Sequence, residues 1–387
     1  MNKKELELYI HIPFCVRKCS YCDFLSAPAT EQTREAYMAA LFAEIGGRAK
    51  DYSDRTVTSI FIGGGTPSLL SGEQIGQLMD RIREQFAMAQ DAEITMEVNP
   101  GTVSAEKLRI FYTAGINRLS IGMQSAQAEE LKNLGRIHDF EGFCQVYREA
   151  VEAGFTNINV DIMSGLPGQT LASYRDTLEK VLHLEPMPQH ISAYSLIVEE
   201  GTPFAAMAER GELPLPEEET ERAMYEETIE VLAKYGFHRY EISNYARDGY
   251  ECRHNVGYWI RRDYLGFGIG AASLIDNVRF QNEKSLGAYL AHPLESREEE
   301  QTLTVQDRME ETMFLGLRLT RGVSCVDFAE QYGRTVEEVY GEVIARNVAD
   351  GLLTVTERKE NQKKDRLLAL TKRGLDLSNY VMAQFLF

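Results

Sequence analysis

The sequence has no hydrophobic run long enough to cross a membrane and no excess of positive charge. None of its apolar stretches approaches the ~18 residues of a membrane span. Its 41 basic residues are outnumbered by 59 acidic ones, which gives a formal net charge of -18. This balance argues against a protein that mainly neutralises nucleic-acid phosphates. We therefore expect a chain that neither spans a membrane nor binds nucleic acid.

Signals for export and for a disulfide framework are also missing. The opening MNKKELELYIHIPF lacks the long apolar region and the small-residue cleavage site of a signal peptide. The predicted location is the cytoplasm, where thiols stay reduced. The chain has only six cysteines, and Cys15, Cys19 and Cys22 stand close together near its start. This clustering favours a metal site over disulfides.

The sequence does contain a regular alternation of apolar runs and helical patterns. Six short β-branched-rich runs recur at 6–13, 58–65, 93–100, 118–125, 157–165 and 190–198. Helical patterns lie between them at 71–86, 104–115, 140–154 and 171–186. Repeated strand–helix–strand units predict right-handed crossovers and a parallel sheet. Periodicity alone leaves both an open doubly wound sheet and an incomplete barrel possible.

This rhythm stops after about residue 205. The segment 213–236 predicts a charged, exposed helix, and an irregular segment rich in aromatic residues and glycine follows it. From about residue 300, three helices and two strands joined by a charged turn outline a winged helix, which we expect to be a packing unit because the chain is acidic. The predicted domains are 1–235, 236–295 and 296–387.

Polar groups stand near the carboxyl ends of the predicted strands. In parallel α/β folds, ligands bind outside these ends. The first strand leads into the cysteines and the second ends in Gly-Gly-Gly-Thr-Pro (63–67), while the others carry Glu97, Gln124, Asp161, Tyr194 and Ser195. We expect these groups to line one cavity, with the cysteines at its mouth.

Three explanations compete for the cysteines. A zinc site could recruit His11 to make a Cys₃His set, although structural zinc sites usually come as two short-spaced pairs. Three free thiols so close together would be a coincidence. A [4Fe–4S] cluster normally has four thiolates, so three would leave one iron open to a ligand that is not protein. The spacing favours the cluster, and the glycine run favours a small bound zwitterion over a plain tight turn because its backbone can be approached closely.

These motifs resemble the radical S-adenosylmethionine (SAM) superfamily. The pattern Cys-x₃-Cys-x₂-Cys, followed by Gly-Gly-Gly-Thr-Pro, is joined by YIHIPFC, FIGGGTPS, EVNP, SIGMQS, LGRIH and DIMSGLPGQT, which resemble its coproporphyrinogen III oxidase-like group. The resemblance covers nearly the whole chain. It implies a partial (β/α)₆ barrel, so the predicted fold class is α/β: this barrel with a smaller C-terminal winged-helix-like α+β domain.

The resemblance also implies roles for individual residues. Cys15, Cys19 and Cys22 would hold a [4Fe–4S] cluster, and SAM would chelate the fourth iron through its amino and carboxylate groups. The SAM region would comprise Tyr9, Tyr21, Gly64, Gly65, Thr66, Glu97, Gln124, Arg136 and Asp161. Among these, Glu97 would accept a hydrogen bond from the SAM amino group. A reduced cluster could then cleave SAM to a radical.

Two branches divide this group: an oxygen-independent oxidase that decarboxylates coproporphyrinogen III, and a haem chaperone. Three features favour the chaperone. Only 14 residues precede Cys15, and Phe24 stands where the oxidase carries a further cysteine. In addition, HNVGYW (254–259) matches the His-Asn-x-x-Tyr-Trp pattern associated with haem binding.

The last motif also suits a porphyrin chemically. A neutral His254 could ligate haem iron, while Tyr258 and Trp259 offer flat apolar faces. Arg261 and Arg262 could pair with propionates; a His-Asn turn followed by core aromatics is the alternative. We predict a haem chaperone that hands haem to acceptor haemoproteins, with respiratory, membrane-associated proteins and a second copy of the chain as candidate partners. The oxidase is the alternative, and we assign no catalytic residue.

Overall fold

Repeated strand–helix units build a curved sheet in the first half of the chain. The computed structural model describes residues 3–295, 297–360 and 363–386. Six parallel strands lie side by side in chain order: β1 (Lys4–Ile12), β2 (Arg55–Gly64), β3 (Ala87–Val98), β4 (Arg118–Gln124), β5 (Ile158–Ser164) and β6 (His190–Ser195). All six predicted strands are confirmed. Sequential order is that of an incomplete barrel, because a doubly wound sheet reverses its strand order.

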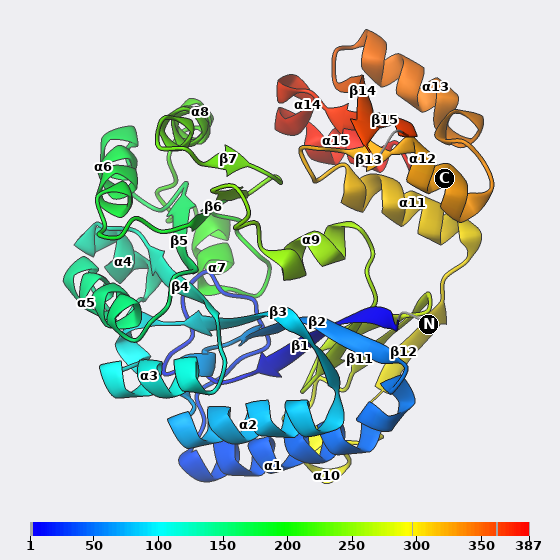
Figure 1. Ribbon diagram of the computed structural model, residues 1–387. Coiled ribbons are helices and arrows are strands. Elements are labelled where there is room, and N and C mark those ends of the chain that lie inside the picture. The colour runs from blue at the N-terminus through cyan, green and yellow to red at the C-terminus, as the bar shows by residue number, and fades with distance from the viewer. Residues whose placement is uncertain (1–2, 296, 361–362, 387) are drawn as a thin grey trace.

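Helices cover the outer face of these strands (Figure 1). They are α1 (Glu31–Arg48), α2 (Gly72–Gln85), α3 (Ala105–Thr113), α4 (Ala128–Leu134), α5 (Phe140–Glu152) and α6 (Leu171–Leu182), with short 3₁₀ turns η1 (Ala49–Tyr52), η2 (Pro67–Leu69) and η3 (Pro100–Thr102). Ser71 and Gln74 form the predicted capping box of α2, and Ser104 caps α3. The four predicted helices are confirmed.

The two faces of each parallel strand differ in chemistry. Successive side chains of a strand point to opposite faces. On β1 the even-numbered Leu6, Leu8, Ile10 and Ile12 are fully buried in the main hydrophobic core. On β4, Arg118, Ser120 and Gln124 alternate with Leu119, Ile121 and Met123, and all of β4 is buried. The apolar set packs under the helices, and the polar set lines the interior of the barrel.

The segment predicted to be irregular, 236–295, instead extends the sheet at both edges. Short strands β7 (His238–Arg239) and β8 (Asn244–Ala246) follow β6 at one edge, while β9 (Tyr264–Phe267), β10 (Ala272–Ile275) and β11 (Val278–Asn282) continue from β1 at the other. The last strand at that edge, β12 (Arg297–Thr302), lies beyond this segment, in the range predicted for the C-terminal domain. Strands β7 to β10 have two to four residues each. Runs this short show no readable two-residue period.

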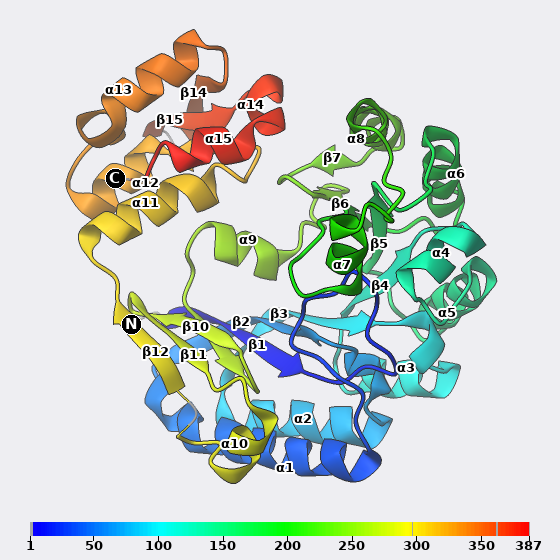
Figure 2. The same ribbon diagram turned by 180° about the vertical axis from the view of Figure 1, so that it is seen from behind.

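Two further helices lie in this extension, α9 (Arg253–Trp259) and α10 (Leu286–Ala291). Two others precede it, α7 (Pro203–Glu209) and α8 (Glu218–Lys234). The prediction that α8 is exposed is wrong for one face, since Met224, Thr228 and Leu232 are buried and the helix contacts α6. In both views α9 lies between the sheet and the C-terminal unit (Figures 1 and 2).

The C-terminal unit has its own hydrophobic core. It contains α11 (Val305–Gly316), β13 (Val323–Ser324), α12 (Cys325–Tyr332), α13 (Val336–Ala349), β14 (Leu353–Glu360), β15 (Lys363–Leu370), α14 (Lys372–Asp376) and α15 (Ser378–Ala383). The predicted order of three helices and two strands is confirmed, and their charged turn, 361–362, lies outside the described residues. The domain boundaries stay predictions. Over the described ranges, no helix is both long enough and apolar enough for a bilayer crossing.

Candidate functional site

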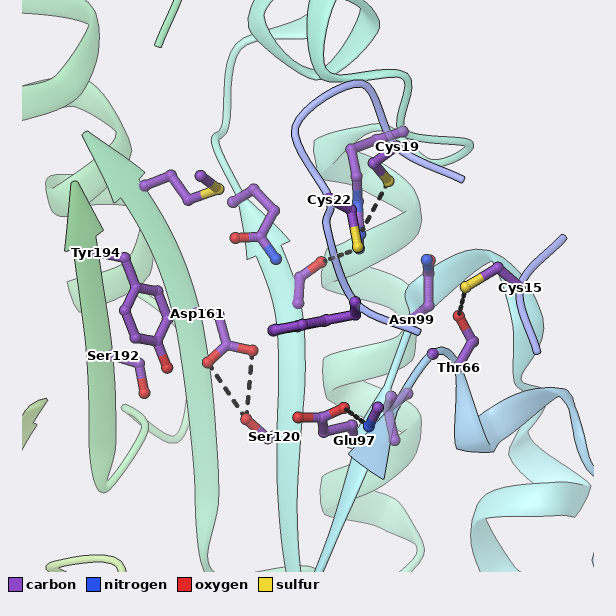
Figure 3. Close-up of a pocket in the computed structure, with 18 of the residues that line it drawn as sticks. Cys15, Cys19, Cys22, Thr66, Glu97, Asn99, Ser120, Asp161, Ser192 and Tyr194 are labelled. Atoms are coloured by element: carbon purple, nitrogen blue, oxygen red, sulfur yellow. Dashed lines mark hydrogen bonds between the residues drawn. The ribbon is translucent and has the colours of Figure 1, made fainter. Parts of the chain in front are cut away.

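A cavity of about 340 Å³ opens among the carboxyl ends of the parallel strands. We call it the cysteine cavity. Figure 3 shows Cys15, Cys19 and Cys22, on the loop after β1, across the cavity from Asp161 and Tyr194 on β5 and β6. The prediction that polar strand ends converge on one cavity is therefore confirmed for most of its members.

Ser195 is the exception among those strand ends. Residues 192 and 194 line the cavity, whereas Ser195 does not. Its hydroxyl lies 3.3 Å from that of Ser164 instead. Neighbouring residues of a strand face opposite sides, so Tyr194 and Ser195 cannot both point into the barrel.

Most residues predicted to bind SAM line the cysteine cavity: Tyr21, Gly64, Gly65, Thr66, Glu97, Gln124, Arg136 and Asp161. Tyr9 does not. Its hydroxyl lies 3.0 Å from Nδ1 of His11, and its ring stacks on Phe61, which lines the cavity in its place. Tyr9 lines a second cavity, described below.

The cysteine loop is held in place by backbone hydrogen bonds at both ends. The N–H of Cys15 donates to the carbonyl of Ala27, and the N–H of Ser20 donates to the carbonyl of Leu134 at the end of α4, both at 3.1 Å. All three thiols are free and partly exposed. The loop therefore presents its sulfur atoms around the cavity mouth on a defined backbone.

Polar side chains approach two of the sulfur atoms. The Thr66 hydroxyl lies 3.5 Å from Sγ of Cys15, and Nη1 of Arg136 lies 3.9 Å from Sγ of Cys19. Hydrogen-bond donors on the cavity wall thus face the sulfur atoms of Cys15 and Cys19. Burial raises the pKa of the Cys22 thiol.

The arrangement suits an iron–sulfur cluster better than a zinc ion. Among the residues that the structure describes, no three His, Cys, Asp or Glu side chains are grouped to hold one metal ion. His11 has other partners, since Nε2 lies 2.8 Å from the Leu25 carbonyl and Nδ1 lies near Tyr9. Cluster thiolates bind different iron atoms. Three separate sulfur atoms around one cavity therefore fit a [4Fe–4S] cluster.

The glycine run lets the ends of β1 and β2 approach closely. Gly64 has φ +107°, and a Cβ there would lie 2.4 Å from the His11 ring. A Cβ on Gly65 would lie 2.7 Å from the Phe14 carbonyl oxygen. The glycine run is thus required for packing. With no side chain at position 64, the backbone N–H of Gly64 can be approached at the cavity, where it donates a hydrogen bond to Glu97 at 3.1 Å.

Two buried carboxyl groups set the electrostatics of the cavity. Burial, together with the charge of Asp161, raises the pKa of Glu97 to about 8. Burial also raises the pKa of Asp161 to about 6, although Asn159 and Ser120 donate hydrogen bonds to it. A cationic ligand would favour the ionised form of both groups. The side of the cavity formed by Glu97 and Asp161 is therefore suited to a positively charged group of a ligand.

A second cavity, of about 590 Å³, adjoins the first. We call it the aromatic cavity. The two cavities share Phe24, Gly64 and Glu97. The aromatic cavity is lined by rings from the barrel, from α9 and from the C-terminal unit: Tyr9, His11, Phe24, Tyr258, Trp259, Tyr264 and Phe314. It therefore contains two of the three residues predicted to bind haem.

His254, the third, lines neither cavity. It is 1% exposed. Nδ1 lies 2.8 Å from the Ser59 hydroxyl, and Nε2 lies 3.1 Å from the Tyr258 hydroxyl. Burial and the charges of Arg118 and Arg262 lower the pKa of His254 to about 3, so its ring is neutral. Iron ligation by His254 would require Tyr258 to move aside.

The two arginines predicted to reach propionates already have acidic partners. Nε of Arg261 lies 2.8 Å from Glu311, and Arg262 contacts Glu5 at 3.0 Å and Glu7 at 3.2 Å. Only Arg261 lines the aromatic cavity. The geometry therefore leaves Arg262 on the outside of this site.

Several residues of the cysteine cavity were missed at the sequence level: Phe61, Asn99, Arg118, Ser120, Asn159, Met163, Ser192 and Asn255. A signal for some of them existed. Polar residues fall on alternate positions at the start of β4, β5 and β6: Arg118 and Ser120, Asn159 and Asp161, and His190 and Ser192. Because the intervening residues are apolar and both faces are buried, the runs resemble ordinary buried strands.

Comparison with known proteins agrees with this architecture. Residues 9–181 match the Radical SAM superfamily, and residues 303–377 match the HemN C-terminal domain. Heme chaperone HemW of Bacillus subtilis (strain 168) is 38% identical over 385 residues, which is 98% of this chain and 98% of that protein. Heme chaperone HemW of Escherichia coli (strain K12) is 37% identical over 358 residues, covering 90% and 92%.

A solved structure resembles the whole chain. The coproporphyrinogen III oxidase HemN from Escherichia coli, a radical SAM enzyme, superposes with a TM-score of 0.85 at 28% identity, covering 100% of this chain and 91% of that one. The relatives thus share the barrel, the extension and the C-terminal unit. The chain belongs to the radical SAM superfamily, in the family of HemW proteins with a HemN C-terminal domain.

Proposed function

We propose that this protein is a haem chaperone of the HemW type, which binds haem in the aromatic cavity and passes it to acceptor haemoproteins. The observation that carries the proposal is the aromatic cavity itself. It is large, it is lined by tyrosine, tryptophan and phenylalanine rings, and it adjoins the cysteine cavity. Flat rings suit a porphyrin face.

The cysteine cavity would hold the resident cofactors. Cys15, Cys19 and Cys22 would bind a [4Fe–4S] cluster, and the iron without a thiolate would take SAM. When reduced, such a cluster supplies one-electron reduction of bound SAM. The residues of this chain would position the cofactor. Glu97 would accept a hydrogen bond from the SAM amino group, and this positive partner would lower the raised pKa of its buried carboxyl.

Trp259 would contribute most to haem binding. Its Nε1–H is buried, and no acceptor for it lies among the residues that the structure describes, although buried donors are normally paired. Arg318 lies 4.3 Å from the centre of the Trp259 ring, which fixes the ring beside the cavity. Tyr258 places a second ring in the same cavity.

A haem titration of anaerobically reconstituted protein tests the proposal. We expect a saturable Soret change in the wild type and no protoporphyrinogen from coproporphyrinogen in the presence of SAM and a reductant. Trp259→Leu should weaken haem affinity about tenfold, since the variant loses a stacking ring. Tyr380→Phe, on an exposed side chain of α15, is the matched control.

His254→Ala and Tyr258→Phe separate the roles of the motif residues. Loss of an iron-ligand signature in His254→Ala supports the predicted ligation. Rapid decarboxylation of coproporphyrinogen that is insensitive to Trp259→Leu, with no saturable Soret change, would assign the chain to the oxidase branch and overturn the proposal.

A further inference from the structure

A buried arginine at the cysteine cavity has no ionic partner among the residues that the structure describes. Arg118 on β4 is 2% exposed, yet it lines the cavity. Its Nη1 lies 3.4 Å from the Thr95 hydroxyl, a long hydrogen bond, and its Nε has no hydrogen-bond partner in the described part of the chain. Within the described chain it forms no ion pair. A guanidinium has five N–H donors, so most of the donor capacity of Arg118 is unused.

Other arginines with similar burial are paired. Nη1 of Arg48 lies 2.7 Å from Glu44, and Nη2 of Arg55 lies 2.6 Å from Asp276. Isolating a charge from water without a partner is costly. The charge of Arg118 is compensated through space by nearby acidic groups, which raise its pKa, but these groups leave its N–H donors unused. The position of those donors at a cavity wall suggests an acceptor that enters from the cavity.

Two buried carboxylates of the barrel interior are engaged elsewhere. Glu93 accepts hydrogen bonds from the backbone N–H groups of Arg253 and His254, both at 3.2 Å. Asp161 accepts from Asn159 at 2.7 Å. Their negative charge makes a buried guanidinium tolerable at this depth, but their oxygen atoms do not occupy its donors.

The position of α9 connects this arginine with the aromatic cavity. Asn255 lines the cysteine cavity, together with Arg118, whereas Tyr258 and Trp259 line the aromatic cavity. One short helix thus contributes to both spaces. A ligand whose ring lies against Trp259 could extend a short acidic arm past Asn255 into the cysteine cavity.

We propose that Arg118 binds a carboxylate and that, given the haem chaperone function proposed above, this carboxylate is a propionate arm of the bound tetrapyrrole. The planar guanidinium fork matches a planar carboxylate in a bidentate arrangement. The arm anchors the ligand across both cavities, and the ring stays in the aromatic cavity.

The first experiment uses sodium propionate as the probe on the full chain, without haem. Propionate should raise the thermal midpoint of the wild type above its value in sodium chloride of equal ionic strength. Arg118→Met should show no such difference between the two salts, even if its midpoint in sodium chloride is lowered by the loss of the charge near Glu93 and Asp161. Arg175→Met, on an exposed side chain of α6, should respond like the wild type.

Two outcomes of this experiment overturn the carboxylate site. One is a wild type that does not respond to propionate. The other is an Arg118→Met variant that responds as the wild type does. Arg118→Lys provides a folded check, since it keeps the charge but loses the fork, and its response should be intermediate.

The second experiment compares haem with haem dimethyl ester, which has no free propionate. The wild type should bind the diacid about tenfold more tightly than the ester, as expected for one charge-assisted pair, and Arg118→Met should bind both equally. Equal binding of the two by the wild type overturns the propionate assignment. If the wild type binds neither but responds to propionate, the haem function fails while the carboxylate site stands.

Discussion

At the residue scale, Glu97 makes the stability of the protein depend on pH. Its pKa in the folded protein is raised to about 8 by burial and by Asp161, whereas an unfolded glutamate titrates near ~4.3. Between these values the folded state binds more protons than the unfolded state. The contribution of Glu97 to stability is therefore fully present below the lower pKa and is lost as the pH rises through the higher one.

We expect Glu97→Gln to stabilise the cofactor-free protein at pH 8.5 by roughly 2–4 kcal/mol and to have little effect at pH 4.5. Glutamine can still accept from the Gly64 N–H, so the hydrogen bond is kept. Urea unfolding at the two pH values measures the difference. Glu106→Gln, on the exposed face of α3, should show no such dependence, and a Glu97→Gln profile parallel to that of the wild type would contradict the assignment.

The sequence predicts which residues form the functional site, but it predicts the direction of their side chains less reliably. The cysteines, Glu97 and Asp161 were predicted from motifs and strand ends, and all lie at one cavity. The prediction that Ser195 lines the cavity is wrong, because neighbouring residues of a strand point to opposite faces. His254 is neutral as predicted, but its burial behind Tyr258 depends on how α9 docks onto the barrel, which no local pattern reveals.

At the element scale, α9 depends on an unusually close approach to β1. A Cβ on Gly257 would lie 2.0 Å from Oε1 of Glu7, and Glu7 is fully buried. Glu93 holds the first turn of the same helix through two backbone N–H groups. The helix is thus fixed against the barrel by a missing side chain and by a buried carboxylate.

Gly257→Ala should therefore destabilise the protein by about 1–3 kcal/mol, because the buried carboxyl group of Glu7 would have to shift away from its ion pair with Arg262. Gly76→Ala is the matched control: Gly76 lies in the interior of α2, where an added methyl group would have nothing within 4 Å, and it should stabilise by about 0.5–1 kcal/mol. Urea denaturation of both variants measures the contrast. Equal effects of the same sign would show that α9 does not pack as described.

The sequence predicts long elements better than short ones. The six parallel strands and their helices carry clear periodicity and capping signals, as at Ser71 and Ser104. The extension shows no strand pattern in the sequence, so it was predicted to be irregular. Its strands form because they pair with β1 and β6, which are distant in the sequence. Helix α9 is equally short and is held by tertiary contacts.

At the scale of the whole molecule, Glu311 joins the barrel extension to the C-terminal unit. It is 6% exposed and accepts from Arg261 at 2.8 Å and from Arg279 at 2.6 Å. All three residues line the aromatic cavity. The wall of the proposed haem site is therefore also the contact between the two units.

Glu311→Gln should lower the free energy of unfolding by about 2–4 kcal/mol, since it leaves two arginines without their carboxylate. It should also weaken haem binding and speed proteolysis near residues 303–304, which connect β12 to α11. Urea denaturation, the Soret titration and limited proteolysis report these effects. Glu342→Gln, on an exposed side chain of α13, is the control, and unchanged stability in Glu311→Gln would remove this contact from the account.

The most direct test of the central claim is to determine the metal of the cysteine cavity and its response to SAM. Anaerobically reconstituted protein should contain about four iron atoms and about four sulfides per chain, and its reduced electron paramagnetic resonance spectrum should change when SAM is added. Cys22→Ala should lose the cluster. Tightly bound zinc with no cluster that can be reconstituted, or a cluster spectrum that ignores SAM, would contradict the claim that three thiols leave one iron open.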